Sequence, residues 1–101
     1  MNTKYGNVND LMIKDYKKKL HSKIHWLLIY KENDECTCFE DYFISLMKYI
    51  NALCELFNNN SIIIDLMATL QVAYNESHSD NYSYKTYRKY VLDAHNIVDK
   101  L

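Results

Sequence analysis

The sequence predicts a small all-α protein that folds as an antiparallel four-helix bundle, and three observations support this class. The 101 residues include one glycine and no proline, so the body of the chain lacks the two strongest helix breakers. Apolar residues recur at spacings of three and four in four separate stretches, which is the period of one helical face. The segments between these stretches are short and polar, and short connections favour antiparallel neighbours.

The length and composition indicate one globular domain. A chain of 101 residues buries roughly two-thirds of its unfolded surface, so a single core is feasible. Hydrophobic residues make up 49% and charged residues 25%, which is ordinary for a folded protein and argues against disorder. We expect residues 1–9 to form a flexible N-terminal tail and residues 10–101 to form a single helical domain.

The first helix is expected to run from about residue 10 to about residue 31. Asn9 or Asp10 can accept a hydrogen bond from an exposed backbone amide at its start. A single apolar stripe follows at helical spacing, formed by Ile13, Tyr16, Leu20, Ile24 and Leu27.

The second helix follows the acidic turn 32–35. Thr37 and Glu40 fit a capping box, in which each side chain accepts a bond from the other's backbone amide. A wide apolar face comes next, formed by Phe39, Tyr42, Phe43, Leu46, Met47, Ile50, Leu53, Cys54 and Phe57.

Two further helices follow the asparagines 58–60, which tolerate left-handed backbone and can end a helix in place of glycine. Ser61 is the expected cap of the third helix and Ser83 of the fourth. Their apolar stripes contain Ile63, Leu66, Met67, Leu70 and Tyr74 in the third helix, and Tyr84, Tyr87, Val91, Ala94 and Val98 in the fourth.

The chain has the features of a cytosolic protein. The first seven residues are polar and resemble no secretory leader, and the longest apolar run, Trp26 to Tyr30, is far shorter than the ~20 residues of a membrane span. The odd set Cys36, Cys38 and Cys54 fits reduced thiols. The many lysines, asparagines, isoleucines and tyrosines have AT-rich codons, which points to a low-GC bacterium or to a phage or mobile element within one.

The end of the first helix is the first candidate site. The run from Trp26 to Tyr30 is apolar around the whole helix, and a helix that is apolar all round is expected to be buried all round. Either this segment closes the end of the bundle, or its outer side meets a partner protein or a second copy. Because Trp and Tyr are enriched in interfaces, Trp26, Ile29 and Tyr30 are the predicted partner-binding residues.

Two basic segments could contribute to the binding of a partner. The lysines of the first helix, Lys14, Lys17, Lys18, Lys19 and Lys23, form a solvated face or a docking surface for an acidic protein. The stretch from Tyr82 to Tyr90 interleaves four tyrosines with three cations, which suits single-stranded nucleic acid or a second protein contact. From this stretch we predict Tyr82, Arg88, Lys89 and Tyr90 as partner-binding residues. The formal net charge of −1 favours the protein over the nucleic acid.

A metal site would need an unusual spacing. His21 and His25 share one face of the first helix, and together with Cys36 and Cys38 they would supply two nitrogens and two thiolates for tetrahedral zinc. Zinc-binding cysteine pairs are usually separated by two residues rather than one. We therefore predict no metal and no cofactor, with zinc binding by these four residues as the open alternative.

Motifs of known enzymes are absent from the sequence, which has no glycine-rich phosphate loop, no zinc-protease motif and no nucleophile elbow. Arg88 and His95, seven positions apart in the fourth helix, resemble the Arg-His motif of HEPN-domain ribonucleases, which are dimeric and all-α. That resemblance would imply His95 as a base or phosphate contact and Arg88 as a phosphate clamp. Lys89 replaces the polar residue usual after the arginine, and the match covers two residues of a chain that is short for that fold.

The function expected from these observations is that of a small helical protein-binding module, an adaptor or inhibitor without enzymatic activity. It would act by burying aromatic anchors in a homodimer or a hetero-complex. A nucleic-acid-binding protein that uses residues 82–90 is the alternative. A bacteriocin-immunity-like protein, by analogy of size and fold, and a HEPN-like ribonuclease are lesser alternatives.

Overall fold

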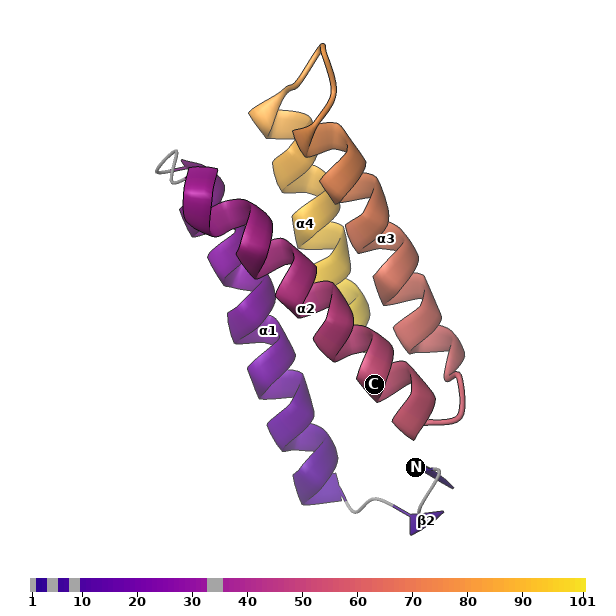
Figure 1. Ribbon diagram of the computed structural model, residues 1–101. Helices are drawn as coiled ribbons and strands as arrows, with labels where there is room; N and C mark the ends of the chain where they lie inside the picture. The colour runs from indigo at the N-terminus through magenta and orange to yellow at the C-terminus, as the bar shows by residue number, and fades with distance from the viewer. Residues whose placement is uncertain (1, 4–5, 8–9, 33–35) are drawn as a thin grey trace.

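The protein is a small antiparallel four-helix bundle (Figure 1). The computed structural model describes residues 2–3, 6–7, 10–32 and 36–101, with side chains from residues 11–32 and 38–101. The helices in this part of the chain are α1 (Asp10–Glu32), α2 (Cys36–Leu56), α3 (Ser61–Ser77) and α4 (Tyr84–Val98). Both α1 and α3 pack against α2 and α4, so the four helices close a ring around one core.

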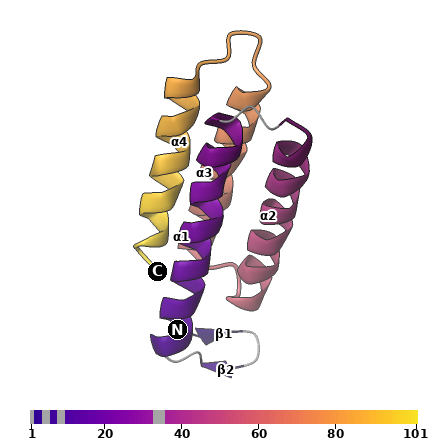
Figure 2. The ribbon, with the colours of Figure 1, turned by 90° about the vertical axis from the view of Figure 1, so that its left-hand side faces the viewer.

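Two short strands precede the bundle. Strand β1 (Asn2–Thr3) pairs with β2 (Gly6–Asn7) in antiparallel register, with Asn2 opposite Asn7 and Thr3 opposite Gly6. The expected tail thus contains a two-residue ladder, and its other positions lie outside the described residues. Figure 2 shows this hairpin beside the N-terminal turns of α1, which extend beyond the last turn of α4.

The end of α2 confirms the role predicted for asparagine. Asn58 and Asn59 have φ angles of 57° and 58°. The Asn59 amide donates to the Cys54 carbonyl at 2.8 Å, and the Asn58 amide donates to the Glu55 carbonyl at 3.3 Å. These two bonds form a Schellman motif in which Asn58 occupies the place usually taken by glycine.

The N-terminal caps match the sequence in part. Ser83 caps α4, accepting a bond from the Thr86 amide at 3.4 Å as predicted. The prediction for Ser61 is wrong, because the side chain of Asn60 accepts the bond from the Ile62 amide at 2.9 Å. Helix α2 begins at Cys36, so Thr37 lies within its first turn. The cap expected at Asn9 lies outside the described residues.

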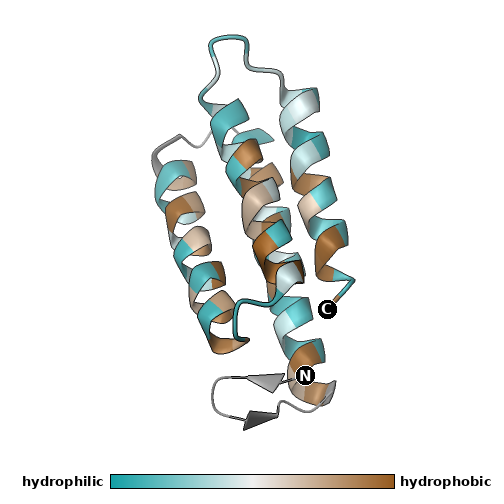
Figure 3. Cartoon of the chain, turned by 90° about the vertical axis from the view of Figure 1, so that its right-hand side faces the viewer, coloured by the Kyte–Doolittle hydropathy of each residue, from teal (hydrophilic) through white to brown (hydrophobic). Residues whose placement is uncertain are grey.

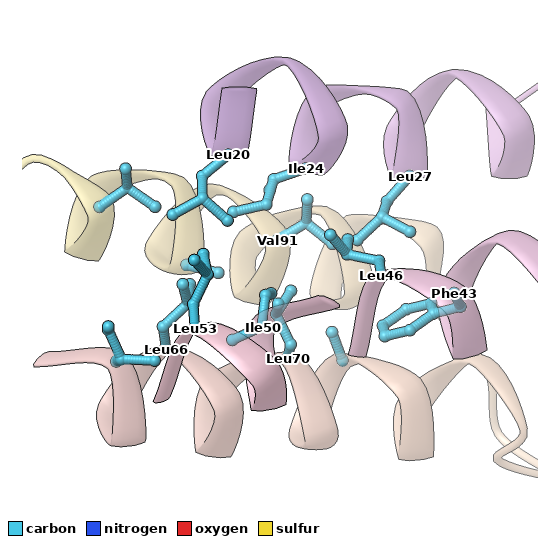
Figure 4. Packing of buried hydrophobic residues seen from close by; sticks show 14 of the residues in the cluster. Leu20, Ile24, Leu27, Phe43, Leu46, Ile50, Leu53, Leu66, Leu70 and Val91 are labelled. Carbon is cyan, nitrogen blue, oxygen red and sulfur yellow. The ribbon is translucent and has the colours of Figure 1, made fainter. Parts of the chain in front are cut away.

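The core is formed by apolar side chains from all four helices (Figure 4). Figure 4 shows Leu20 and Ile24 of α1 pointing between the other helices toward side chains such as Ile50 and Val91. The fully buried set contains Leu20, Ile24, Leu27, Phe43, Ile50, Ile63, Leu66, Leu70, Tyr87, Val91 and Val98. Burial of this apolar area is the main term that stabilises the bundle.

Apolar and polar residues alternate along each helix (Figure 3). Within the described residues, no helix combines the length and the hydropathy required to cross a lipid bilayer.

Candidate functional site

Trp26 lies on the outside of α1. Its neighbours Leu27 and Leu28 are buried in the core, Ile29 and Tyr30 are half-buried, and the Trp26 side chain is 44% exposed. The apolar run is therefore covered on one side only, and the expectation of burial around the whole helix is wrong. The inner side of α1 meets the core, which leaves the largest side chain of the run open to solvent.

The ring of Trp26 begins a row of aromatic contacts that crosses from α1 to α2. The Trp26 and Tyr30 ring centroids are 5.5 Å apart, and those of Tyr30 and Tyr42 are 5.1 Å apart. The Tyr42 hydroxyl donates to the Lys23 carbonyl at 2.7 Å. Burial, with a smaller effect from Tyr30, raises the pKa of Tyr42 to about 12, so this hydroxyl keeps its proton at neutral pH. The Tyr42 ring is thus held in place by a hydrogen bond to the backbone of α1.

Further ring contacts lie along α1 toward its N-terminus. The Lys23 ammonium lies 5.0 Å above the ring of Tyr49, and Tyr16 packs edge-on against Phe57 at 5.7 Å. We call the side chains of Tyr16, Trp26, Tyr30, Tyr42 and Tyr49 the aromatic seam. Lys19 flanks the seam and pairs with Asp15 at 3.0 Å.

The sequence signal for the α2 half of the seam is a second stripe at helical spacing. Tyr42, Ser45, Tyr49, Ala52 and Leu56 recur at intervals of three and four, on a side of α2 different from its buried stripe. Sequence reasoning assigned only Tyr42 to a face and placed it in the core. The second stripe was missed because Ser45 and Ala52 are small and do not stand out by hydropathy.

The tyrosines of the 82–90 stretch are used largely by the fold. Tyr87 is fully buried, Tyr84 and Tyr90 are half-buried, and Tyr82 is 38% exposed. The Tyr82 ring is itself covered by the Lys31 ammonium at 4.7 Å. Four free stacking platforms for bases are therefore not present in this stretch.

The cations of the same stretch are exposed. Lys85, Arg88 and Lys89 line a shallow hollow of about 420 Å³ on α4, together with Thr86, Leu92 and Asp93. The predicted residues Arg88 and Lys89 thus lie together, on a surface separate from the aromatic seam. His95 is not among the residues that line this hollow.

Charge is segregated between the helices. Helices α1 and α4, which are neighbours, carry nine Lys or Arg residues and four Asp or Glu residues. Helices α2 and α3 carry one lysine and five carboxylates. The near-neutral total therefore conceals a basic side and an acidic side.

A histidine pair lies between α1 and α4. The rings of His21 and His95 stack at 4.1 Å, and His21 Nε2 lies 3.0 Å from Asp99 Oδ1 without the alignment of a hydrogen bond. Burial lowers the pKa of His95, as do the nearby His21 and His25, whereas Asp99 raises it. His95 therefore favours the neutral form more than a free histidine does.

The four residues considered for zinc are differently placed. The His21 ring stacks on the His95 ring and lies close to the Asp99 carboxylate. Cys38 is exposed near the start of α2. The side chain of Cys36 lies outside the described residues. Over the part of the chain that is described, no group of three His, Cys, Asp or Glu residues is arranged to hold a metal ion.

A further surface is the groove between α2 and α3. It has a volume of about 350 Å³ and is lined by Phe43, Ile44, Met47 and Tyr74, with Lys48, Asn51 and Gln71 as polar lining residues. Sequence reasoning did not single it out, although the exposed Ile44 and Ile64 depart from the stripes of their helices.

Comparisons of the chain with protein-family models, with curated proteins and with solved structures return no match.

Proposed function

We propose that the protein is a small helical protein-binding module, an adaptor or inhibitor, whose anchor is the Trp26 side chain. The observation that carries the proposal is the combination of exposure and support at Trp26. The ring is 44% exposed, yet Tyr30 and Tyr42 hold the row of rings to which it belongs. A pre-positioned aromatic side chain loses little conformational freedom on binding, which is the usual property of an interface hot spot.

Charge around the anchor indicates how a partner would approach. Lys23 and Lys19 lie on the same helix as Trp26, one turn and two turns before it, respectively. Such cations steer an acidic surface toward the anchor, while the buried aromatic area supplies most of the affinity. Ile29 and Tyr30 are half-buried and would form the border of the contact. The cytosolic location and the phage or mobile-element origin remain predictions from the sequence.

The test uses two exposed apolar residues of similar accessibility, Trp26 on α1 and Ile64 on α3, which is 46% exposed. A photo-reactive residue at position 26 should cross-link to a partner that mass spectrometry identifies, including a second copy. Trp26→Ala should weaken the complex with that partner by about 30-fold, the usual size of a hot-spot effect. Ile64→Ala should leave the affinity unchanged. Equal losses from both substitutions, or no loss from Trp26→Ala, would reject the proposal.

Nucleic-acid binding is a second candidate function, and the segregated charge supports it. The basic residues of α1 and α4 lie on neighbouring helices, so the objection from a near-neutral total charge loses its force. The contact would be with phosphates, because the tyrosines of α4 are engaged within the fold.

This second candidate can be tested with fluorescently labelled single-stranded and duplex RNA. Affinity should fall steeply with salt and should be lost on Lys85→Glu with Arg88→Glu. Lys48→Glu, on the acidic side of the bundle, is the matched control. This candidate is rejected if Lys48→Glu weakens RNA binding as much as the double variant does. It is also rejected if neither RNA binds at low salt.

A further inference from the structure

The α1/α2 side of the bundle carries two complementary stripes. The stripe on α1 contains Tyr16, Lys19, Lys23, Trp26 and Tyr30, and that on α2 contains Tyr42, Ser45, Tyr49, Ala52 and Leu56. Both alternate intervals of three and four residues, which is the spacing of helices that pack side by side along their length. Within the molecule these side chains are half-buried or exposed, so their outer surfaces remain available to another pair of helices.

The contacts between the stripes join large side chains of α1 to tyrosines of α2. Tyr30 meets Tyr42, and Lys23 meets Tyr49. Trp26 lies between Lys23 and Tyr30 on α1, and Ser45 lies between Tyr49 and Tyr42 on the antiparallel α2. Both Trp26 and Ser45 are exposed. The face thus presents an exposed aromatic ring on α1 and an exposed small side chain on α2.

The charges of α1 and α2 are compatible with self-association through this face. The sequence of α1 has six lysines and three carboxylates, whereas α2 has one lysine and three carboxylates. A two-fold axis parallel to these helices sets α1 of one copy on α2 of the other, so that unlike charges meet twice. An axis perpendicular to the helices would set α1 on α1, and pairing through the α2/α3 groove would set acidic helices together. Both arrangements bring like charges together, which costs free energy.

The area available is sufficient for a dimer. Helices of 23 and 21 residues are each about 30 Å long and about 10 Å wide. A face of two helices therefore offers roughly 600 Å² per copy, or about 1,200 Å² in total, which is the lower end of stable interfaces. We expect a dimer that dissociates on dilution.

We infer that the partner of the aromatic seam is a second copy of this chain, joined through the α1/α2 faces about a two-fold axis parallel to these helices. In this dimer the stripe on α1 of each copy, which contains Lys19, Lys23 and Trp26, lies against the stripe on the partner's α2 that contains Ser45. The inference rests on the proposed function and specifies its partner.

The first test adds a large side chain at a small, exposed residue of the α2 stripe. Ser45→Arg should convert the dimer to a monomer in light scattering and sedimentation from ~1 to ~300 µM, a range around the micromolar affinities of weak interfaces. Ser45 is exposed, so the variant should keep its helical circular-dichroism signal. Ala68→Arg, at an exposed small residue on α3, is the control and should remain dimeric.

The second test exchanges charges. Lys19→Glu with Lys23→Glu makes both helices of the face acidic, and Asp41→Lys with Glu55→Lys makes both basic. Each double variant should be monomeric alone, and an equimolar mixture should form a one-to-one heterodimer, because unlike charges then meet at both contacts. Low salt should strengthen the heterodimer.

The outcomes separate this inference from the proposed function. A wild-type protein that is monomeric throughout the concentration range overturns the dimer, as does a mixture of the charge variants that stays monomeric. In either case, a different identified partner that is lost with Trp26→Ala would leave the proposed function standing. A dimer that Ser45→Arg dissociates but Trp26→Ala leaves intact would support the interface and reject Trp26 as its anchor.

Discussion

The Tyr87 hydroxyl donates a hydrogen bond to the Leu27 carbonyl at 3.1 Å, joining α4 to α1 across 60 positions of the sequence. Tyr87 is fully buried, and burial raises the pKa of its hydroxyl, so the donor proton is retained. The bond fixes the polar end of the largest fully buried side chain, so the stretch that suggested nucleic-acid stacking also stabilises the interior.

Removal of this hydroxyl should destabilise the protein. Tyr87→Phe keeps the ring and deletes the donor, so the free energy of unfolding in urea should fall by about 1 kcal/mol. Tyr82→Phe, at a half-exposed ring, should change it by less than about 0.5 kcal/mol. A Tyr87→Phe protein as stable as the wild type would show that the bond adds nothing.

The left-handed residue after α2 should discriminate between small side chains. Asn58→Ala places a Cβ-bearing residue with no side-chain compensation at φ 57°, so unfolding should require about 1 kcal/mol less. Asn58→Gly should retain or raise the wild-type stability, because glycine adopts this conformation freely. Thermal or urea unfolding of the two variants checks this order, and the reverse order would contradict the Schellman assignment.

Stability should decrease in mild acid because of His95. The unfolded histidine takes up a proton near its usual pKa of about 6.5, whereas burial and His21 keep the folded pKa of His95 lower. The unfolded state therefore binds more protons in this window, and stability is lost as pH falls below about 6.5. Urea unfolding at pH 7.5 and pH 5.5 should show this loss, and His95→Gln should reduce it. An unchanged pH dependence in His95→Gln would assign the effect to other groups.

Truncation of a buried side chain should lower the free energy of unfolding much more than truncation of an exposed one. Ile50 is fully buried, and Ile50→Ala should cost about 2–5 kcal/mol of unfolding free energy because it leaves a cavity. Trp26→Ala removes a larger but exposed side chain, so the cost at a concentration where the protein is monomeric should be below about 1.5 kcal/mol. Comparable losses would mean that Trp26 is a structural residue of the monomer.

The helical elements could be predicted from the sequence because their signals are local. The apolar stripe that includes Leu20 and Ile24, the asparagines after α2 and the cap at Ser83 all act within one or two turns of the chain. The wrong prediction at Ser61 also arises from a local signal, because Asn60 and Ser61 are adjacent and both residue types are favoured as N-caps.

The surfaces could be predicted only in part. Trp26 and Tyr30 were identified from an unusual apolar run, but their contact with Tyr42 depends on how α1 and α2 pack. Tyr82 and Tyr90 were considered as binding residues, yet the first lies under Lys31 and the second is half-buried. Such pairings join residues far apart in sequence, where no local pattern reports them.

The amino-acid order determines where each helix begins and ends and which of its sides is apolar, because backbone capping and helical spacing depend on near neighbours. The packing of the four helices decides which second stripe stays uncovered, that Trp26 is exposed while Leu27 and Leu28 are buried, and that the basic helices α1 and α4 lie together, as do the acidic helices α2 and α3. Those outcomes follow from burying four apolar faces in one core, a constraint that acts on the whole chain at once.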